Sequence, residues 1–246
     1  MDGPTNETRL SGVQTLWSQL RLAHDDASTA HRAAREALLR RYAGAVRRYL
    51  IVVVRDREAA DDLAQEFALR FLRGDFRNAD PGRGRFRDYV KVAVLNLVTD
   101  HHRRQKARPV AVPPEGLNLA DTADPEDGVF RESWRDELLD RAWEALAGVE
   151  RETGRPLHTV LKLRAGHPKA SSTELAELVA ARLGKPVTAV GVRQTLHRAR
   201  EKFAELLLDA VADSLEAPTR ERLGEELEEL GLLGYCKPML ERWGAT

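Results

Sequence analysis

Residues 171–203 read SSTELAELVAARLGKPVTAVGVRQTLHRAREKF, a stretch that combines helix-capping residues with an apolar helical period. Ser171 and Glu174 have the spacing of a capping box, which begins a helix that Gly184 can end. Thr188 then caps a second helix. Its apolar residues recur every three or four positions, as on the buried stripe of a helix; they are Val192, Leu196, Ala199 and Phe203. The stretch therefore predicts two helices joined by a short Gly-Lys-Pro turn.

The same helical spacing extends through most of the chain, and no stretch has the alternation of a convincing strand. Further helices are expected over residues 35–54, 56–74, 86–104, 130–153, 156–165 and 219–230. We therefore predict an all-α fold with two helical domains, at residues 32–108 and 130–215. Residues 109–129, rich in proline and acidic residues, are expected to form a flexible acidic linker. Residues 1–31 and 216–246 are expected to be N- and C-terminal extensions of these two domains. The C-terminal extension is acidic and has leucines at helical spacing, and these leucines need burial.

Composition narrows the class of protein. The 246 residues are 42% hydrophobic and 32% charged, with a single cysteine, Cys236, so a disulfide framework is excluded. The longest apolar stretch, residues 50–54, is too short for a membrane span, and no signal peptide is visible, so we expect a cytoplasmic protein. No catalytic, cofactor or metal motif appears. His101 and His102 are adjacent on a helix, point about 100° apart, and cannot chelate one ion. An enzyme is the least favoured class.

The formal net charge of the chain is zero, but the charged residues are unevenly distributed along the sequence. Residues 1–112 carry 21 Lys and Arg against 14 Asp and Glu, whereas residues 113–156 carry 5 against 12. Residues 157–215 carry 9 against 6, and residues 216–246 carry 4 against 7. Two basic blocks are thus separated by an acidic segment and followed by an acidic tail, a pattern that bears on binding partners.

The second helix of the opening stretch has the side chains of a DNA-reading helix. In a helix–turn–helix, this helix enters the major groove, where Arg and Gln can make two hydrogen bonds to guanine or adenine. The residues left facing outward are Arg193, Gln194, His197, Arg198 and Arg200. Arg198 and Lys202 are suited to hold phosphates. An ordinary antiparallel helix pair with a charged exterior remains the alternative.

A second basic stretch surrounds a glycine-rich loop. Arg83, Arg85, Arg87 and Lys91 lie near Phe86 and Tyr89. Cations, rings and a flexible backbone suit single-stranded DNA, which is held by charge and by stacking. The alternative for Phe86 and Tyr89 is burial in the core, because both belong to an apolar helical stripe.

Three stretches together resemble the extracytoplasmic-function (ECF) sigma factors of the sigma-70 family, the promoter-recognition subunits of bacterial RNA polymerase. They are DREAADDLAQEFALRFLRG (56–74), FRDYVKVAVLNLVTDHHRR (86–104) and GVRQTLHRAREKF (191–203). The first is similar to region 2.2, the second to regions 2.3 and 2.4, and the third to the recognition helix of region 4.2. Their order and spacing also agree with that family.

The resemblance implies two partners, core RNA polymerase and promoter DNA, and leaves open an anti-sigma protein. The implied polymerase contacts are Asp61, Asp62, Gln65, Glu66 and Arg70. The implied contacts to a melted −10 element are Arg83, Arg85, Arg87, Lys91, Asn96, Asp100, Arg103 and Arg104. The implied contacts to a duplex −35 element are Thr188, Arg193, Gln194, His197, Arg198, Arg200 and Lys202. No cofactor is implied.

Two other classes remain as alternatives. A helix–turn–helix regulator would bind duplex DNA without polymerase, usually as a symmetric dimer. A helical interaction module would use its basic surfaces on acidic proteins and would direct no promoter-dependent transcription.

Overall fold

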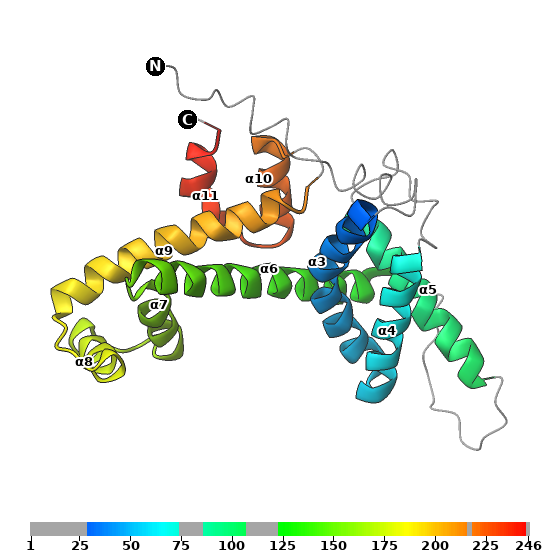
Figure 1. The fold of residues 1–246 in the computed structure, drawn as a ribbon, viewed down its shortest axis with the longest axis horizontal. Coiled ribbons are helices and arrows are strands. Elements are labelled where there is room, and N and C mark those ends of the chain that lie inside the picture. The colour runs from blue at the N-terminus through cyan, green and yellow to red at the C-terminus, as the bar shows by residue number, and fades with distance from the viewer. Residues whose placement is uncertain (1–28, 74–85, 107–122, 216–217, 245–246) are drawn as a thin grey trace. The chain divides into compact units, whose positions relative to one another are not determined.

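The computed structural model describes residues 29–73, 86–106, 123–215 and 218–244 (Figure 1). Within these ranges the chain forms helices and connecting turns, with no strand, so the all-α prediction is confirmed. The helices are α3 (Thr29–Val54), α4 (Arg57–Arg73), α5 (Phe86–Lys106), α6 (Ala123–Thr153), α7 (Leu157–Gly166), α8 (Ser172–Leu183), α9 (Ala189–Ala212), α10 (Arg220–Glu229) and α11 (Leu233–Arg242). The predicted loop at 74–85, most of the N-terminal extension and residues 109–122 of the predicted linker lie outside the described residues.

The chain divides into two compact units. The first consists of residues 1–137 with 214–217, and the second of residues 138–213 with 218–246. Helix α6 contributes its first half to the first unit and its second half to the second.

The first unit is built on α3 and α4, which pack side by side, and on α5 (Figure 1). Its core holds an aromatic cluster: Tyr42 of α3 stacks on Trp134 of α6, with ring centroids 4.8 Å apart, and meets the edge of Phe86 at 5.0 Å. Phe86 is therefore core, as the apolar stripe allowed. At Gly44 a Cβ atom would lie 1.9 Å from the Glu137 carboxylate, so only glycine admits that side chain without a shift.

The start of α6 differs from the prediction in two ways. The helix begins at Ala123, so residues 123–129, expected in the linker, are helical. Pro125 does not prevent this, because backbone N–H groups in the first turn have no intrahelical acceptor anyway. The second unit also begins at residue 138 instead of 130, because Phe130 and Trp134 pack on the tyrosines of α3.

In the helix–turn–helix of the second unit, the predicted signals mark both ends of α8 and the start of α9. Ser171 and Glu174 form the reciprocal capping box of α8. Gly184 ends α8 with φ 65°, in the left-handed region where glycine pays no Cβ penalty. Thr188 Oγ1 accepts a hydrogen bond from the Gly191 N–H at 3.1 Å and caps α9. The predicted helix boundaries here are confirmed.

The C-terminal extension packs on the second unit, as its leucines predicted. Helices α10 and α11 both contact α9, and Leu223, Leu227 and Cys236 are fully buried. Helix α11 itself was not predicted, because Gly234 and Pro238 both argue against a helix. Its packing against the second half of α9 overrides this local preference.

Candidate functional site

Helix α9 buries one side and exposes the other, and the buried and exposed residues are those that the sequence predicted. Val192, Leu196, Ala199 and Phe203 are buried. The side chains of Arg193, Gln194, Arg198 and Arg200 are exposed, as is His197. We call Arg193, Gln194 and His197 the α9 face, since residues three and four apart on a helix lie next to one another.

Three of the predicted −35 contacts also have partners within the chain. The Thr188 hydroxyl caps α9. His197 Nδ1 lies 3.2 Å from Glu201 Oε2, and Lys202 Nζ lies 3.0 Å from Glu205 Oε1. A phosphate would have to compete with these carboxylates for His197 and Lys202.

Helix α5 also carries an open face. Asn96 and Arg103 are exposed, and Val92 is 53% exposed one turn before Asn96. We call these three residues the α5 face. Lys91 and Asp100 are half-buried. Arg104 is exposed but lies toward α4, where its Nη2 is 3.5 Å from Glu66 Oε2.

Of the three arginines expected to contact DNA ahead of the α5 face, Arg87 lies within the described residues. Arg87, expected among the DNA contacts, is only 6% exposed, with its Nε 3.8 Å from Asp88 Oδ1. Its side chain is thus buried at the start of α5 instead of exposed at the surface. Arg83 and Arg85 lie outside the described residues.

Helix α4 buries Ala60, Leu63, Phe67 and Phe71 and leaves an acidic stripe open. We call Asp62, Gln65, Glu66 and Leu69 the α4 stripe. Asp62 and Gln65 are exposed, and Glu66 is half-buried. Four of the five predicted polymerase contacts lie on or beside this stripe, and the fifth, Asp61, turns toward α3.

Ion pairs within the first unit engage several of these residues. Arg47 of α3 donates two hydrogen bonds to the Asp61 carboxylate, at 2.7 and 3.2 Å, and thereby lowers the pKa of Asp61. Glu66 accepts a hydrogen bond from Arg70 and also pairs with Arg104 of α5. Asp61 and Glu66 thus link α4 to its neighbours, whereas Asp62 and Gln65 form no such ion pair with another residue that the structure describes.

Sequence reasoning missed three open apolar side chains on these surfaces. Leu69 is 53% exposed on the α4 stripe, Val92 is 53% exposed on the α5 face, and Val190 is 54% exposed in the first turn of α9. Each lies off the buried stripe of its own helix, so the helical period could have identified it.

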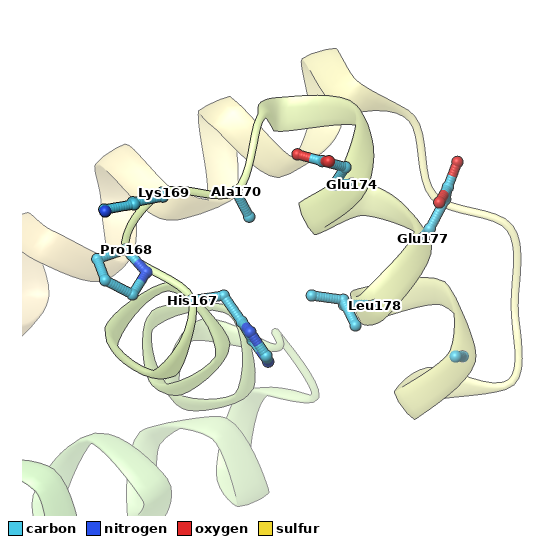
Figure 2. Close-up of a pocket in the computed structure, with 8 residues that line it drawn as sticks. His167, Pro168, Lys169, Ala170, Glu174, Glu177 and Leu178 are labelled. Carbon is cyan, nitrogen blue, oxygen red and sulfur yellow. The ribbon is translucent and has the colours of Figure 1, made fainter.

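A surface cleft of about 690 Å³ lies where the turn after α7 meets α8 (Figure 2). His167 and Leu178 face each other across it, and Lys169, Glu174 and Glu177 add charges of both signs. Arg164 Nη1 donates to the Ala170 carbonyl at 2.6 Å and braces this turn. None of the predicted site residues lines the cleft.

The described helices also bear on metal binding, membrane insertion and thiol reactivity. Across residues 29–73, 86–106, 123–215 and 218–244, no three His, Cys, Asp or Glu side chains gather in a way that could hold a metal ion. None of the helices in those ranges is long and apolar enough to cross a membrane. Cys236 is buried, and burial raises the pKa of its thiol to about 11.

One comparison with known proteins identifies part of the chain. Residues 38–108 match the family model of sigma-70 region 2. No curated protein and no solved structure matches the chain. The matched span contains α4, α5 and most of α3, and hence both the α4 stripe and the α5 face. The chain therefore contains a sigma-70 region 2 domain at residues 38–108.

Proposed function

We propose that this chain is a sigma factor of the extracytoplasmic-function type, which binds core RNA polymerase and directs it to promoters. The observation that carries the proposal is the sigma-70 region 2 domain at residues 38–108, in a chain whose second unit holds a capped helix–turn–helix. The chain would act in the cytoplasm, and the chemistry of RNA synthesis would stay with the polymerase.

The α4 stripe is the proposed contact with polymerase. Its carboxylates, at Asp62 and Glu66, would repel DNA phosphates, so a protein partner suits them better. Leu69 adds an exposed apolar group between them and the end of the helix. A partly apolar, partly charged surface of this kind is typical of a protein–protein interface. Asp61 and Arg70 would support the stripe from either side.

The α5 face is the proposed contact with the melted −10 element. Turning a base out of the duplex costs a few kcal/mol, and a protein that binds the turned-out base can recover that cost and gain specificity. Asn96 can hydrogen-bond a base edge, and Arg103 can hold a phosphate. Lys91, Asp100, Arg83 and Arg85 would border this surface. Arg87 is buried at the start of α5, so it would support this surface from within the fold instead of contacting DNA directly.

The α9 face is the proposed contact with the −35 element as duplex DNA. Arg193 and Gln194 carry the groups that make paired hydrogen bonds to guanine and adenine. Arg198 and Arg200 are exposed on either side and suit the flanking phosphates. Because both DNA-binding surfaces belong to one chain, binding at one element raises the effective concentration of the other.

Complex formation with core polymerase tests this proposal. The purified chain, mixed with sigma-free core RNA polymerase, should co-elute with it in size-exclusion chromatography. Asp62→Arg should weaken the complex, and Glu221→Arg, an equal charge change at an exposed site on α10, should not. Absence of a complex with the unmodified chain contradicts the proposal. Equal binding by both variants removes Asp62 from the contact.

The alternative function is a helix–turn–helix regulator that acts without polymerase. The observation in its favour is that α8 and α9 carry their own caps and belong to a compact unit outside the region 2 match. Such a protein would bind a symmetric duplex site as a dimer in the absence of polymerase.

A further inference from the structure

Val190 is an exposed valine that the stability of the fold does not explain. It is the second residue of α9, is 54% exposed, and lies outside the buried stripe that begins at Val192. Valine is a weaker helix former than alanine, because its branched side chain loses rotamer freedom in a helix. An exposed helical position thus gains little stability from valine, which leaves its side chain available for binding.

Val190 lies on the same side of α9 as the α9 face. It precedes Gln194 by four residues and His197 by seven, so all three lie along one side of the helix. The hydrogen bond from Gly191 N–H to Thr188 Oγ1, at 3.1 Å, holds the first turn in place. In a helix–turn–helix the residues near the N-terminus of the second helix contact base edges in the major groove. Val190 lies at that end.

The chemistry of the major groove restricts what Val190 could contact there. Valine has no hydrogen-bond donor or acceptor, so it gains nothing from the polar groups of the bases. Among the four base pairs, the apolar group displayed in the major groove is the C5-methyl group of thymine. We propose that Val190 is a specificity-determining residue that packs against a thymine methyl group in the −35 element. This inference rests on the proposed function.

Removing the methyl group from DNA tests the contact directly. The probe is a promoter fragment from which the chain and core polymerase start transcripts, with each thymine of the −35 segment replaced in turn by deoxyuridine. One replacement should weaken binding by the unmodified holoenzyme about fourfold, the loss expected when one buried methyl group is removed. With Val190→Ala the same replacement should change the affinity less than about 1.5-fold, as a double-mutant cycle requires for two groups in contact.

A matched control separates this effect from a general loss. Val52→Ala changes a valine of the same exposure, 53%, on α3 of the first unit, and should leave the deoxyuridine effect unchanged. Alanine is the better helix former, so Val190→Ala is expected to fold. If no deoxyuridine replacement distinguishes Val190→Ala from the unmodified chain, the inference is wrong although the proposed function stands. If no promoter fragment is found, both are overturned.

Discussion

At the scale of single residues, the Arg47–Asp61 pair should make the stability of the first unit depend on pH. The hydrogen bonds from Arg47 lower the pKa of Asp61 from its ordinary value of 3.8. The ion pair therefore stabilises the fold at pH values above 3.8. This stabilisation is lost as the pH falls through the lowered pKa of Asp61. Asp61→Asn should therefore lower the melting temperature at neutral pH, with a difference that shrinks at acid pH. Circular dichroism of both proteins, from neutral pH to about pH 3, measures this.

The control for this prediction is Asp62→Asn. Asp62 is the next residue on α4 and is exposed, so its replacement should change the melting temperature little. A difference between Asp61→Asn and the unmodified chain that stays constant across the pH range would contradict the role given to the pair.

Cys236 should be nearly inert in the folded protein. Burial raises the pKa of its thiol to about 11, and only the thiolate reacts with alkylating reagents. At the same pH, a free thiol of ordinary pKa near 8.5 carries on the order of a hundredfold more thiolate. Alkylation by iodoacetamide should thus be slower in the native protein than in guanidinium by at least that factor. Equal rates would show that α11 does not pack Cys236 against α9.

At the scale of helices, Thr188 should act as a cap. Thr188→Ala should cost about 1 kcal/mol of stability, because the Gly191 N–H loses its acceptor. Thr188→Ser keeps a hydroxyl and should retain both the stability and the DNA affinity. Denaturant unfolding and binding to the −35 duplex measure the two effects. Loss of DNA affinity by Thr188→Ser at full stability would instead assign the threonine methyl group a contact with DNA.

The helices that could be predicted from the sequence are those whose ends are marked by local signals. Helix α8 was predicted with both ends and α9 with its start, because Ser171, Gly184 and Thr188 are local signals that act within one turn of the chain. Helix α11 was missed because its support is tertiary packing on α9, which overrides Gly234 and Pro238. Burial of Arg87 was missed for a related reason: a basic residue beside a loop gives no local sign that it turns inward.

The features of the candidate sites also differ in whether one helix alone determines them or two helices together. The period of α9 correctly placed Gln194 on an open face, because an off-stripe position is a property of the sequence itself. The pairing of Glu66 with Arg104 joins residues of two helices and could not be read from either one. The roles proposed for these residues depend on partners and stay predictions.

At the scale of the whole molecule, the division at residue 138 has a testable consequence. Trp134 is fully buried against Tyr42, so Trp134→Ala should cost about 3–5 kcal/mol, the usual loss for a large aromatic in a core. Hydrogen exchange should quicken in α3, α4 and α5 while α8 and α9 stay protected. Leu207→Ala, at a fully buried leucine of α9, should give the opposite pattern. Quickened exchange in α8 and α9 alone with Trp134→Ala would contradict the division.

A transcription assay tests whether this chain directs core polymerase to promoters. Sigma-free core RNA polymerase should be mixed with the purified chain and with genomic fragments, and the run-off products mapped. We predict transcripts that start at defined positions only when the chain is present. With Arg193→Ala these transcripts should become weaker at promoters whose −35 element Arg193 reads. Transcripts without defined starts, together with salt-sensitive duplex binding by the chain alone, would contradict the sigma-factor account and favour a regulator.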